Sequence, residues 1–412
     1  MSEKIIIFAF GLHYNMMRKK RIMILGANAG QAIAINEAHR LGYHVISADI
    51  HPDAPGHAVS DEQAYIDITD QDCVLAEARR RHIDGITPYW SDVLAPVAAY
   101  VAEQLSLPGN PASTVETMTQ KQLFRQLLAK GGFPTPKAKG CRTVEEAVSF
   151  FSTVNAPAML KPIDSSGSRG VFRVCSAADI RMHFDEALAH STLGSVILEE
   201  FIETDLPQQD GDIFVIDGKV VLWGICEQHK DVRLAPYTPA ALLLPSGIDH
   251  DTDAKAKRLI QDVITALDFR TGPCNVEYIV SRDGRIFILD IGPRNGGNMI
   301  PQVIRRATGH NVTAMTLQAA VGDDIAMNEE PHSTCAMSMV VHADHDGTLG
   351  GITLAQPLER RLSDCLYMRH EGDPVRQFHN SSDTIAFMTF SFDSREEMLS
   401  ALDKNPVSVC VR

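Results

Sequence analysis

The sequence lacks the marks of membrane, secreted and nucleic-acid-binding proteins. No apolar run approaches the ~20 residues that a membrane span needs, which predicts no membrane partner. None of the eight cysteines forms a C-x-x-C pair, so we expect reduced thiols and a cytoplasmic location. Acidic residues outnumber basic ones by 52 to 38, and a formal net charge of −14 argues against nucleic acid as a partner.

The first residues do not look like part of the fold. The apolar run from Ile5 to Phe10 is shorter than the one a signal peptide needs. The stretch MMRKKRIMILGANAG then resembles the N-terminus of a protein. We therefore expect residues 1–20 to be a disordered or non-native extension, and the fold to begin near Arg21.

Strands and helices are expected to alternate in the N-terminal quarter of the chain. The hydrophobic spacing predicts strands at 22–25, 45–50 and 84–90 and helices at 32–41, 72–81 and 92–105. This alternation predicts a parallel sheet with helices on both faces. Further along, strand pairs dominate. Asp217-Gly218 and Asp283-Gly284 each lie between two apolar runs, as in β-hairpins.

Gly26 and Gly30 after the first strand suggest a dinucleotide site. Asp49, 23 residues beyond Gly26, lies near the place of the ribose-binding acid in NAD-binding domains. However, Asn28 occupies the position where a glycine would let the backbone approach the pyrophosphate. We therefore expect a tight turn here and no bound NAD.

Lys161 and the polar loop after it form the first candidate site. Lys161 lies in an apolar run, where burial of its ammonium is costly without an anionic partner. The stretch DSSGSRG offers backbone N–H groups and hydroxyls without bulk, which is typical of phosphate-binding loops, although no G-K-[ST] closes it. An exposed hairpin with an edge lysine is the alternative interpretation.

Two acidic residues predict a metal site. Glu277 and Asp290 lie on either side of the Asp283-Gly284 turn, so a hairpin can bring them together. Converging carboxylates repel unless a cation lies between them, and Mg²⁺ prefers oxygen ligands and often holds nucleotide phosphates. Arg294 can offer a bidentate fork to an oxyanion. A structural salt-bridge cluster is the alternative.

In their order along the chain, these motifs resemble the ATP-grasp superfamily over about residues 21–412. The likeness is greatest to carboxylate–amine ligases, carbamoyl-phosphate synthetase and biotin carboxylase-like enzymes. The stretches that carry it are RIMILGANAGQAIAINEAHRLGYHVISADIHPDAP, TMTQKQLFRQLLAKGGFPTPK, MLKPIDSSGSRGV, LEEFI, NVEYI and LDIGPRNGG. The resemblance implies a mixed α/β and α+β fold of four parts. These are a Rossmann-like pre-ATP-grasp domain (21–113), a small ATP-grasp subdomain with a lid (114–198), a large subdomain with the metal site (199–326) and a C-terminal α+β segment (327–412).

The resemblance also implies the site residues. ATP would be bound by Lys121 and Lys161, by the lid residues Ser166, Gly167, Ser168 and Gly170, and by Glu199, Phe201 and Ile202 at the adenine hinge. Glu199 would accept from the adenine amino group. Mg²⁺, or Mn²⁺, would be bound by Glu277 and Asp290, and Arg294 and Lys161 would be catalytic.

The chain departs from the family pattern at two places. Gly292 stands where many members carry an asparagine ligand, which leaves open whether one or two metal ions bind. No single acid matches the family's ribose ligand, and Asp205, Asp210 and Asp212 all stay candidates.

The implied reaction is ATP-dependent ligation through an acyl phosphate. A small-molecule carboxylate attacks the γ-phosphate, and an amine, or a thiol, then displaces the phosphate. A bicarbonate-activating carboxylase of the purine-pathway type and a weakly catalytic ATP-binding scaffold are the alternatives. The resemblance also implies a homodimer.

Three further stretches have a functional and a simpler interpretation. His229 and Lys230 are candidate substrate contacts, but a solvated loop is favoured. The stretch 296–298 is either a substrate-binding loop or a plain connection. The HADHD stretch at 342–346 is read as a chance cluster.

Overall fold

The computed structural model describes residues 18–154, 157–165, 167–327, 334–404 and 407–412. The expected extension at 1–20, apart from its last three residues, and the lid residue Ser166 therefore lie outside the described residues. The described part of the chain forms four β-sheets. Among these residues, no helix has the length and hydrophobicity of a transmembrane segment. All eight cysteines are free thiols, as predicted.

The first sheet is parallel, with strand order β3-β2-β1-β4. Its elements are β1 (Arg21–Leu25), α2 (Ala29–Arg40), β2 (His44–Ala48), η1 (His57–Val59), β3 (Glu62–Ala64), α3 (Gln71–Arg81), β4 (Gly85–Thr87) and α4 (Ala95–Leu105). Met23 and Leu25 pack on the side that α3 and α4 cover, whereas Ile22 and Ile24 face α2 and α11 (Val312–Val321). Alternate residues of a strand point to opposite faces, so both faces of this sheet are buried, as predicted.

The turn after β1 serves packing within the fold. Asp49 accepts from the backbone N–H of Ala27 at 2.9 Å, which ties the turn to β2. Gly26 has a φ of +90°. A side chain at Gly30 would collide with the ring of Trp90. Gly30 and Asp49 thus have packing reasons to stand in a tight turn.

The second sheet is antiparallel, with strand order β5-β8-β6-β7. This part comprises α5 (Ala112–Thr119), α6 (Lys121–Lys130), β5 (Ala138–Cys141), α7 (Val144–Phe151), β6 (Ala158–Pro162), β7 (Phe172–Val174), α8 (Ala177–Ala189) and β8 (Val196–Glu200). Leu160, Leu198 and Phe184 belong to its buried core. The predicted limit between 198 and 199 falls inside β8, so we propose that the small subdomain extends to the end of that strand.

The third sheet has eight strands in the order β13-β12-β9-β10-β11-β14-β18-β16 and is antiparallel. Its strands are β9 (Gln209–Ile216), β10 (Lys219–Lys230), β11 (Pro239–Leu244), β12 (Gly272–Val280), β13 (Ile286–Gly292), β14 (Cys335–Val341), β16 (Leu362–Tyr367) and β18 (Ala386–Phe392). Helices α9 (His250–Ala266) and α10 (Ile300–Thr308) pack on it. Both predicted hairpins are present, β9–β10 and β12–β13. The C-terminal strands extend the same sheet.

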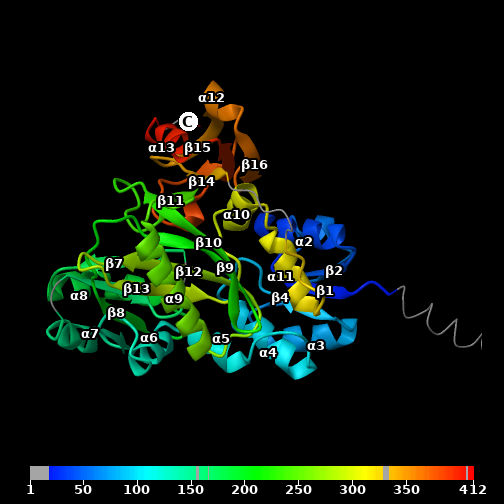
Figure 1. Ribbon diagram of the computed structural model, residues 1–412, viewed down its shortest axis with the longest axis horizontal. Helices are drawn as coiled ribbons and strands as arrows, with labels where there is room; N and C mark the ends of the chain where they lie inside the picture. Colours follow the sequence, from blue (N-terminus) through cyan, green and yellow to red (C-terminus); the bar gives the residue numbers. More distant parts are fainter. Residues whose placement is uncertain (1–17, 155–156, 166, 328–333, 405–406) are drawn as a thin grey trace, which may run out of the picture.

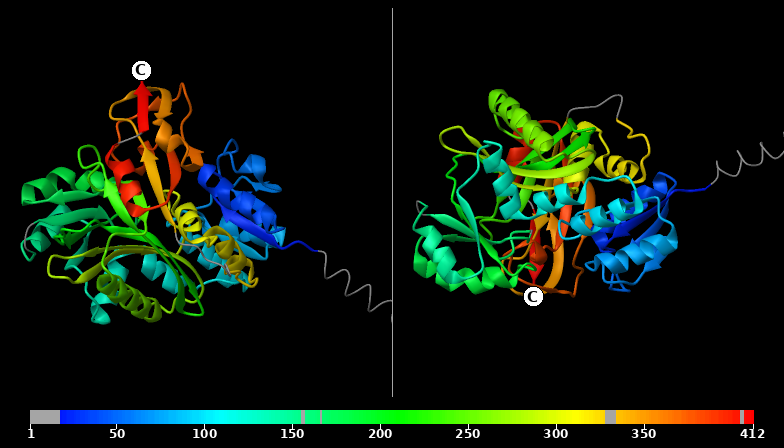
Figure 2. Two further views of the ribbon diagram at one scale, coloured as in Figure 1. Left: turned by 45° about the horizontal axis from the view of Figure 1, so that its top comes forward. Right: turned by 90° about the horizontal axis from the view of Figure 1, so that it is seen from below.

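The remaining elements lie in the C-terminal segment. They are β15 (Gly347–Leu354), α12 (Gln356–Glu359), β17 (Pro374–Val375), η2 (Ser381–Asp383), α13 (Arg395–Asp403) and β19 (Val407–Val411), and the small sheet has the order β17-β15-β19. Figure 1 shows the second sheet, β5-β8-β6-β7 (teal), and the N-terminal domain (blue) on opposite sides of the eight-stranded third sheet, called the long sheet below. The C-terminal strands (orange and red) stand above them, and Figure 2 shows the same arrangement from two other sides.

Candidate active site

A cavity of about 510 Å³ lies between the second and third sheets. Its apolar lining includes Met159, Val171, Phe201, Ile202, Ile279 and Leu289, and its charged lining includes Lys121, Lys161, Glu199, Glu277, Asp290 and Arg294. These surfaces match the two parts of a nucleotide, an apolar base and a polyanionic phosphate chain. Gly167 and Ser168 also line it, whereas Gly170 does not, and Ser166 lies outside the described residues.

Lys161 has the anionic partner that its burial requires. Its Nζ donates to Oε2 of Glu199 at 2.8 Å, and Glu199 is 2% exposed. The strand β6 lies between β8 and β7 inside its sheet, so the alternative of an exposed edge lysine is wrong. Burial acts to raise the pKa of Glu199, but Arg125 and Lys161 outweigh it and lower that pKa to about 2.

Arg125 is a site residue that the sequence analysis missed. Its Nε donates to Oε1 of Glu199 at 2.8 Å, and its terminal nitrogens donate to the carbonyls of Ile288 and Leu289 at 3.2 and 2.6 Å. It thus joins α6 and β8 to β13 across the cavity wall. Its position four residues after Lys121 places both cations on one face of α6, which is the signal that could have revealed it.

Lys121 lines the cavity and contacts the loop after β6 and the strand β13. Its Nζ donates to the carbonyl of Ser165 at 2.8 Å and lies 3.4 Å from Oδ2 of Asp290. Burial acts to lower the pKa of Lys121, but Asp290, Asp92 and Glu199 outweigh it and raise that pKa. The side chain therefore stays a cation at neutral pH.

The predicted carboxylates converge. Glu277 on β12 lies directly opposite Asp290 on β13 and directly opposite Asp210 on β9, so three acids form one row across three strands. Burial, followed by repulsion from Asp210 and Asp290, raises the pKa of Glu277 to about 8. Burial also raises the pKa of Asp210, to about 6. Of the three acids, Glu277 and Asp290 line the cavity, and a cation bound between these two would relieve their repulsion.

The donor set fits a magnesium ion held jointly with phosphates. No three acidic, histidine or cysteine groups among the described residues already form a metal-binding cluster. Mg²⁺ commonly takes one or two carboxylates and completes its shell with phosphate oxygens and water. Glu277 makes no ion pair with a described residue and accepts from Nε2 of Gln208 at 2.6 Å, so the salt-bridge alternative does not hold for it.

The candidate ribose acids have other partners. Asp212 is buried and accepts from the backbone N–H of Gly296 at 2.7 and 2.9 Å. Asn275 donates to Asp210 at 3.0 Å and to Asp212 at 3.2 Å. Asp205 pairs with Arg282 on the surface. None of the three acids lines the cavity, so none of them is singled out as the ribose ligand. The backbone N–H of Gly296 donates to Asp212 and is therefore not available to a substrate.

Lys230 corrects the interpretation of its segment. Strand β10 continues to Lys230, so the favoured interpretation of a solvated loop is wrong. Its Nζ donates to Oε1 of Gln208 at 3.0 Å, and both residues line the cavity. Burial lowers its pKa, against the pull of Glu277 and Asp210. His229 also lines the cavity, and its Nε2 lies 2.7 Å from Oε1 of Glu227.

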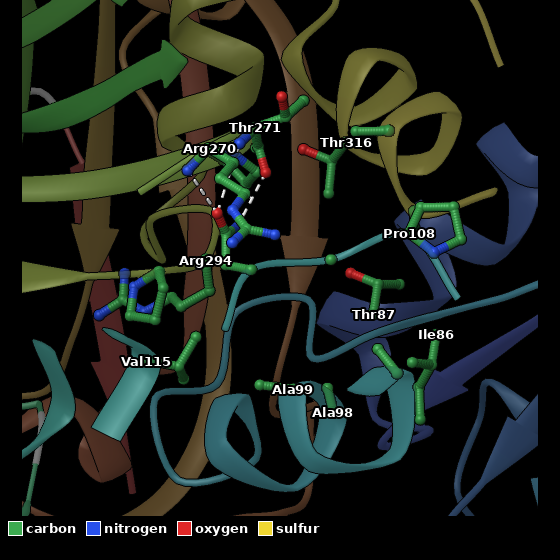
Figure 3. A pocket seen from close by; sticks show the side chains of 18 of the residues that line it. Ile86, Thr87, Ala98, Ala99, Pro108, Val115, Arg270, Thr271, Arg294 and Thr316 are labelled. Atoms are coloured by element: carbon green, nitrogen blue, oxygen red, sulfur yellow. Dashed lines mark hydrogen bonds between the residues drawn. The ribbon is translucent and has the colours of Figure 1, made fainter. Parts of the chain in front are cut away.

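Arg294 lies between two cavities. It lines the cavity described above and also a second one of about 420 Å³, shown in Figure 3. In that view Arg294 and Val115 lie at one end, and Thr87 and Pro108 lie at the other. Burial acts to lower the pKa of Arg294, but the neighbouring Asp92 outweighs it and keeps that pKa well above its usual value.

The sequence is similar to proteins of known family. The family model of the ATP-grasp domain matches residues 154–302. The formate-dependent phosphoribosylglycinamide formyltransferase of Burkholderia lata is 32% identical over 284 residues, which cover 66% of this chain and 69% of that protein. The uncharacterized protein y4rH of Sinorhizobium fredii is 26% identical over 393 residues, covering 92% of this chain and 80% of that protein.

Solved structures show the same fold. The L-amino acid ligase from Bacillus licheniformis has a TM-score of 0.82 at 20% identity, and the match covers 96% of this chain and 99% of that one. The phosphoribosylglycinamide synthetase from Anaerococcus prevotii has a TM-score of 0.75 at 20% identity, covering 96% and 100%. The expected mixed fold and the expected class of enzyme are confirmed: the chain belongs to the ATP-grasp family.

Proposed function

We propose that the protein is an ATP-dependent ligase that joins a small-molecule carboxylate to an amine, or to a thiol, through an acyl phosphate. ATP is converted to ADP and phosphate. The observation that carries the proposal is one cavity lined by the cations of Lys121, Lys161 and Arg294 together with the carboxylates of Glu277 and Asp290. Phosphoryl transfer depends on positioning and on neutralised charge, and these groups offer both.

Each predicted residue has a role in this account. Phe201 and Ile202 pack against the adenine, and Glu199 keeps lone pairs that can accept from its amino group. Lys121 and Lys161 bind phosphate oxygens. Gly167 and Ser168, with Ser166 and Gly170 of the same predicted lid, cover the phosphates and exclude water, which would otherwise hydrolyse the acyl phosphate.

Glu277 and Asp290 would hold Mg²⁺, or Mn²⁺. The ion supplies charge neutralisation between the phosphate oxygens when bound. Arg294 donates to the transferring phosphoryl group and then to the acyl phosphate. The carboxylate oxygen that attacks the γ-phosphorus leaves with phosphate when the amine attacks the carbonyl carbon, and the amine loses one proton.

The names of similar proteins guide the choice of substrate. Formate is a carboxylate, and so are L-amino acids, which are the groups named for the formyltransferase and the amino acid ligase. A solved biotin carboxylase domain with ADP and bicarbonate shares the fold, which keeps the bicarbonate-activating carboxylase as the second candidate. That structure is described as a dimer, and we propose a homodimer here also.

The test is a screen for ADP release. Purified protein with Mg-ATP is offered formate, bicarbonate, amino acids and other small carboxylates, each alone and with amines, beside an Arg294→Ala control. We expect ADP release that requires one class of carboxylate and is lost in the control. Release of AMP would refute the acyl phosphate, and tight ATP binding without any release would favour the scaffold.

A further inference from the structure

The guanidinium of Arg294 is held from the N-terminal domain. Asp92, in the turn before α4, accepts from Nε of Arg294 at 2.7 Å and from Nη2 at 2.5 Å. The two side chains are only 19% and 13% exposed, although 202 residues separate them in the sequence. A bidentate pair fixes both the position and the plane of a guanidinium.

This pairing uses one edge of the guanidinium and leaves another available. Nη1 donates to the carbonyl of Asn295 at 3.2 Å, so three of the five N–H groups have acceptors among the described residues. The other two N–H groups, one on each terminal nitrogen, make no hydrogen bond to a described residue. They are the groups that Arg294 can direct at an oxyanion in the nucleotide cavity.

Gly292 makes room for Asp92. A Cβ atom at position 292 would overlap Oδ1 of Asp92 and would lie 3.2 Å from Nε of Arg294. The carboxylate of Asp92 therefore fills the space above β13 that a side chain at 292 would take. The glycine that departs from the family pattern thus has a steric reason in this chain.

The second cavity explains why Arg294 needs such a partner. Figure 3 shows Arg294 at the end of an open space bounded by Ala98 and Ala99 of α4 on one side and by Thr316 of α11 on the other. Without Asp92, the guanidinium has room to turn away from the nucleotide cavity. A catalytic group misplaced by about 1 Å can cost about 10²-fold in rate.

We propose that Asp92 is a positioning residue that holds Arg294 in its catalytic orientation, in the space that Gly292 leaves free. The inference rests on the proposed function of Arg294. It makes the N-terminal domain part of the catalytic apparatus, because movement of that domain against the long sheet would carry Asp92 and move Arg294.

Asp92→Asn, Asp92→Ala and Gly292→Ala test this inference. We expect kcat to fall about 10²-fold in Asp92→Ala and less in Asp92→Asn, which keeps one acceptor, while KM for ATP stays within about threefold. As a single substitution, Gly292→Ala should lower kcat, because its methyl group displaces the carboxylate of Asp92. Added to Asp92→Ala, the same substitution should not lower kcat further, because the carboxylate that the methyl group would displace is absent.

Asp364→Asn is the matched control. Asp364 also accepts from both edge nitrogens of an arginine, Arg306, at 3.0 and 2.9 Å, but in the C-terminal segment, away from the cavity. It should leave kcat unchanged. Should Asp92→Ala fail to fold, Asp92→Asn and Gly292→Ala still decide the question.

The outcomes separate the two claims. Suppose that the wild type releases ADP with a carboxylate and that Asp92→Asn or Gly292→Ala keeps kcat within twofold of the wild-type value. This result overturns the positioning role of Asp92 but leaves the proposed function intact. The positioning role is also overturned if the losses of kcat caused by Asp92→Ala and by Gly292→Ala add up in the double variant. A wild type without carboxylate-dependent ADP release refutes the proposed function, and the role of Asp92 falls with it.

Discussion

Replacement of Glu199 by glutamine probes the buried link between the two ATP-grasp sheets. Glu199 is 2% exposed, and its two oxygens accept from Arg125 and Lys161 at 2.8 Å each. Its pKa falls from 4.5 to about 2 in the folded protein, which corresponds to about 3 kcal/mol of stabilisation. Loss of one partner from a buried ion pair costs a similar amount, about 3–5 kcal/mol.

The expected result is a lower melting temperature. For a folding unit of about 150–250 residues, about 3 kcal/mol lowers the midpoint by roughly 6–12 °C. Differential scanning fluorimetry at pH 7 measures this shift. Glu200→Gln is the matched control, since it makes the same change one residue along β8, where the side chain points to the other face. Glu200 makes only a 3.4 Å contact to the N–H of Lys137.

The pH dependence gives the sign of the effect. Because the pKa of Glu199 is lower in the folded than in the unfolded state, its stabilisation is complete above about pH 4.5 and is lost as the pH falls toward 2. The difference in melting temperature between wild type and Glu199→Gln should therefore narrow below pH 4.5. A variant that melts within 2 °C of the wild type at pH 7, or a gap that does not narrow with acid, would refute this reasoning.

Three further predictions follow from single contacts. Lys121→Ala should raise KM for ATP about 10- to 100-fold, because a charged hydrogen bond to phosphate contributes about 1.5–3 kcal/mol; steady-state kinetics measures this, and an unchanged KM would contradict it. Glu277→Gln should raise the Mg²⁺ concentration for half-maximal ADP release at least about tenfold, and a chelator should stop release until Mg²⁺ or Mn²⁺ is restored. Gly30→Ala should lower the melting temperature by several degrees, because its methyl group overlaps the ring of Trp90; equal melting temperatures would show that the ring moves freely.

The parts of the site that the sequence predicts are those set by local rules. Glu277 and Asp290 face each other because a short turn joins their strands, and hydrophobic alternation fixes the register of the pair. Lys161 was recognisable because a lysine in an apolar strand needs an anionic partner, which is Glu199. In each case, a local pattern supplied the expectation.

The missed parts depend on contacts between distant segments. Nothing near Asp92 in the sequence indicates that its carboxylate will meet Arg294, because their pairing requires the N-terminal domain to pack against the long sheet. Arg125 contacts Glu199 for the same kind of reason, because the fold brings residues 74 positions apart together. The prediction for Lys230 was wrong because strand β10 extends beyond its apolar stretch. The polar end of the strand lines the cavity instead of forming a solvated loop.

An acyl phosphate intermediate can be demonstrated by following an oxygen atom of the carboxylate substrate. Once a carboxylate substrate is found, it is supplied with ¹⁸O in both carboxyl oxygens, with Mg-ATP and the amine, and the released phosphate is analysed by mass spectrometry. We expect one ¹⁸O atom in each phosphate formed by ligation, because the attacking carboxylate oxygen leaves with the phosphoryl group. Unlabelled phosphate, or label found in AMP, would contradict it.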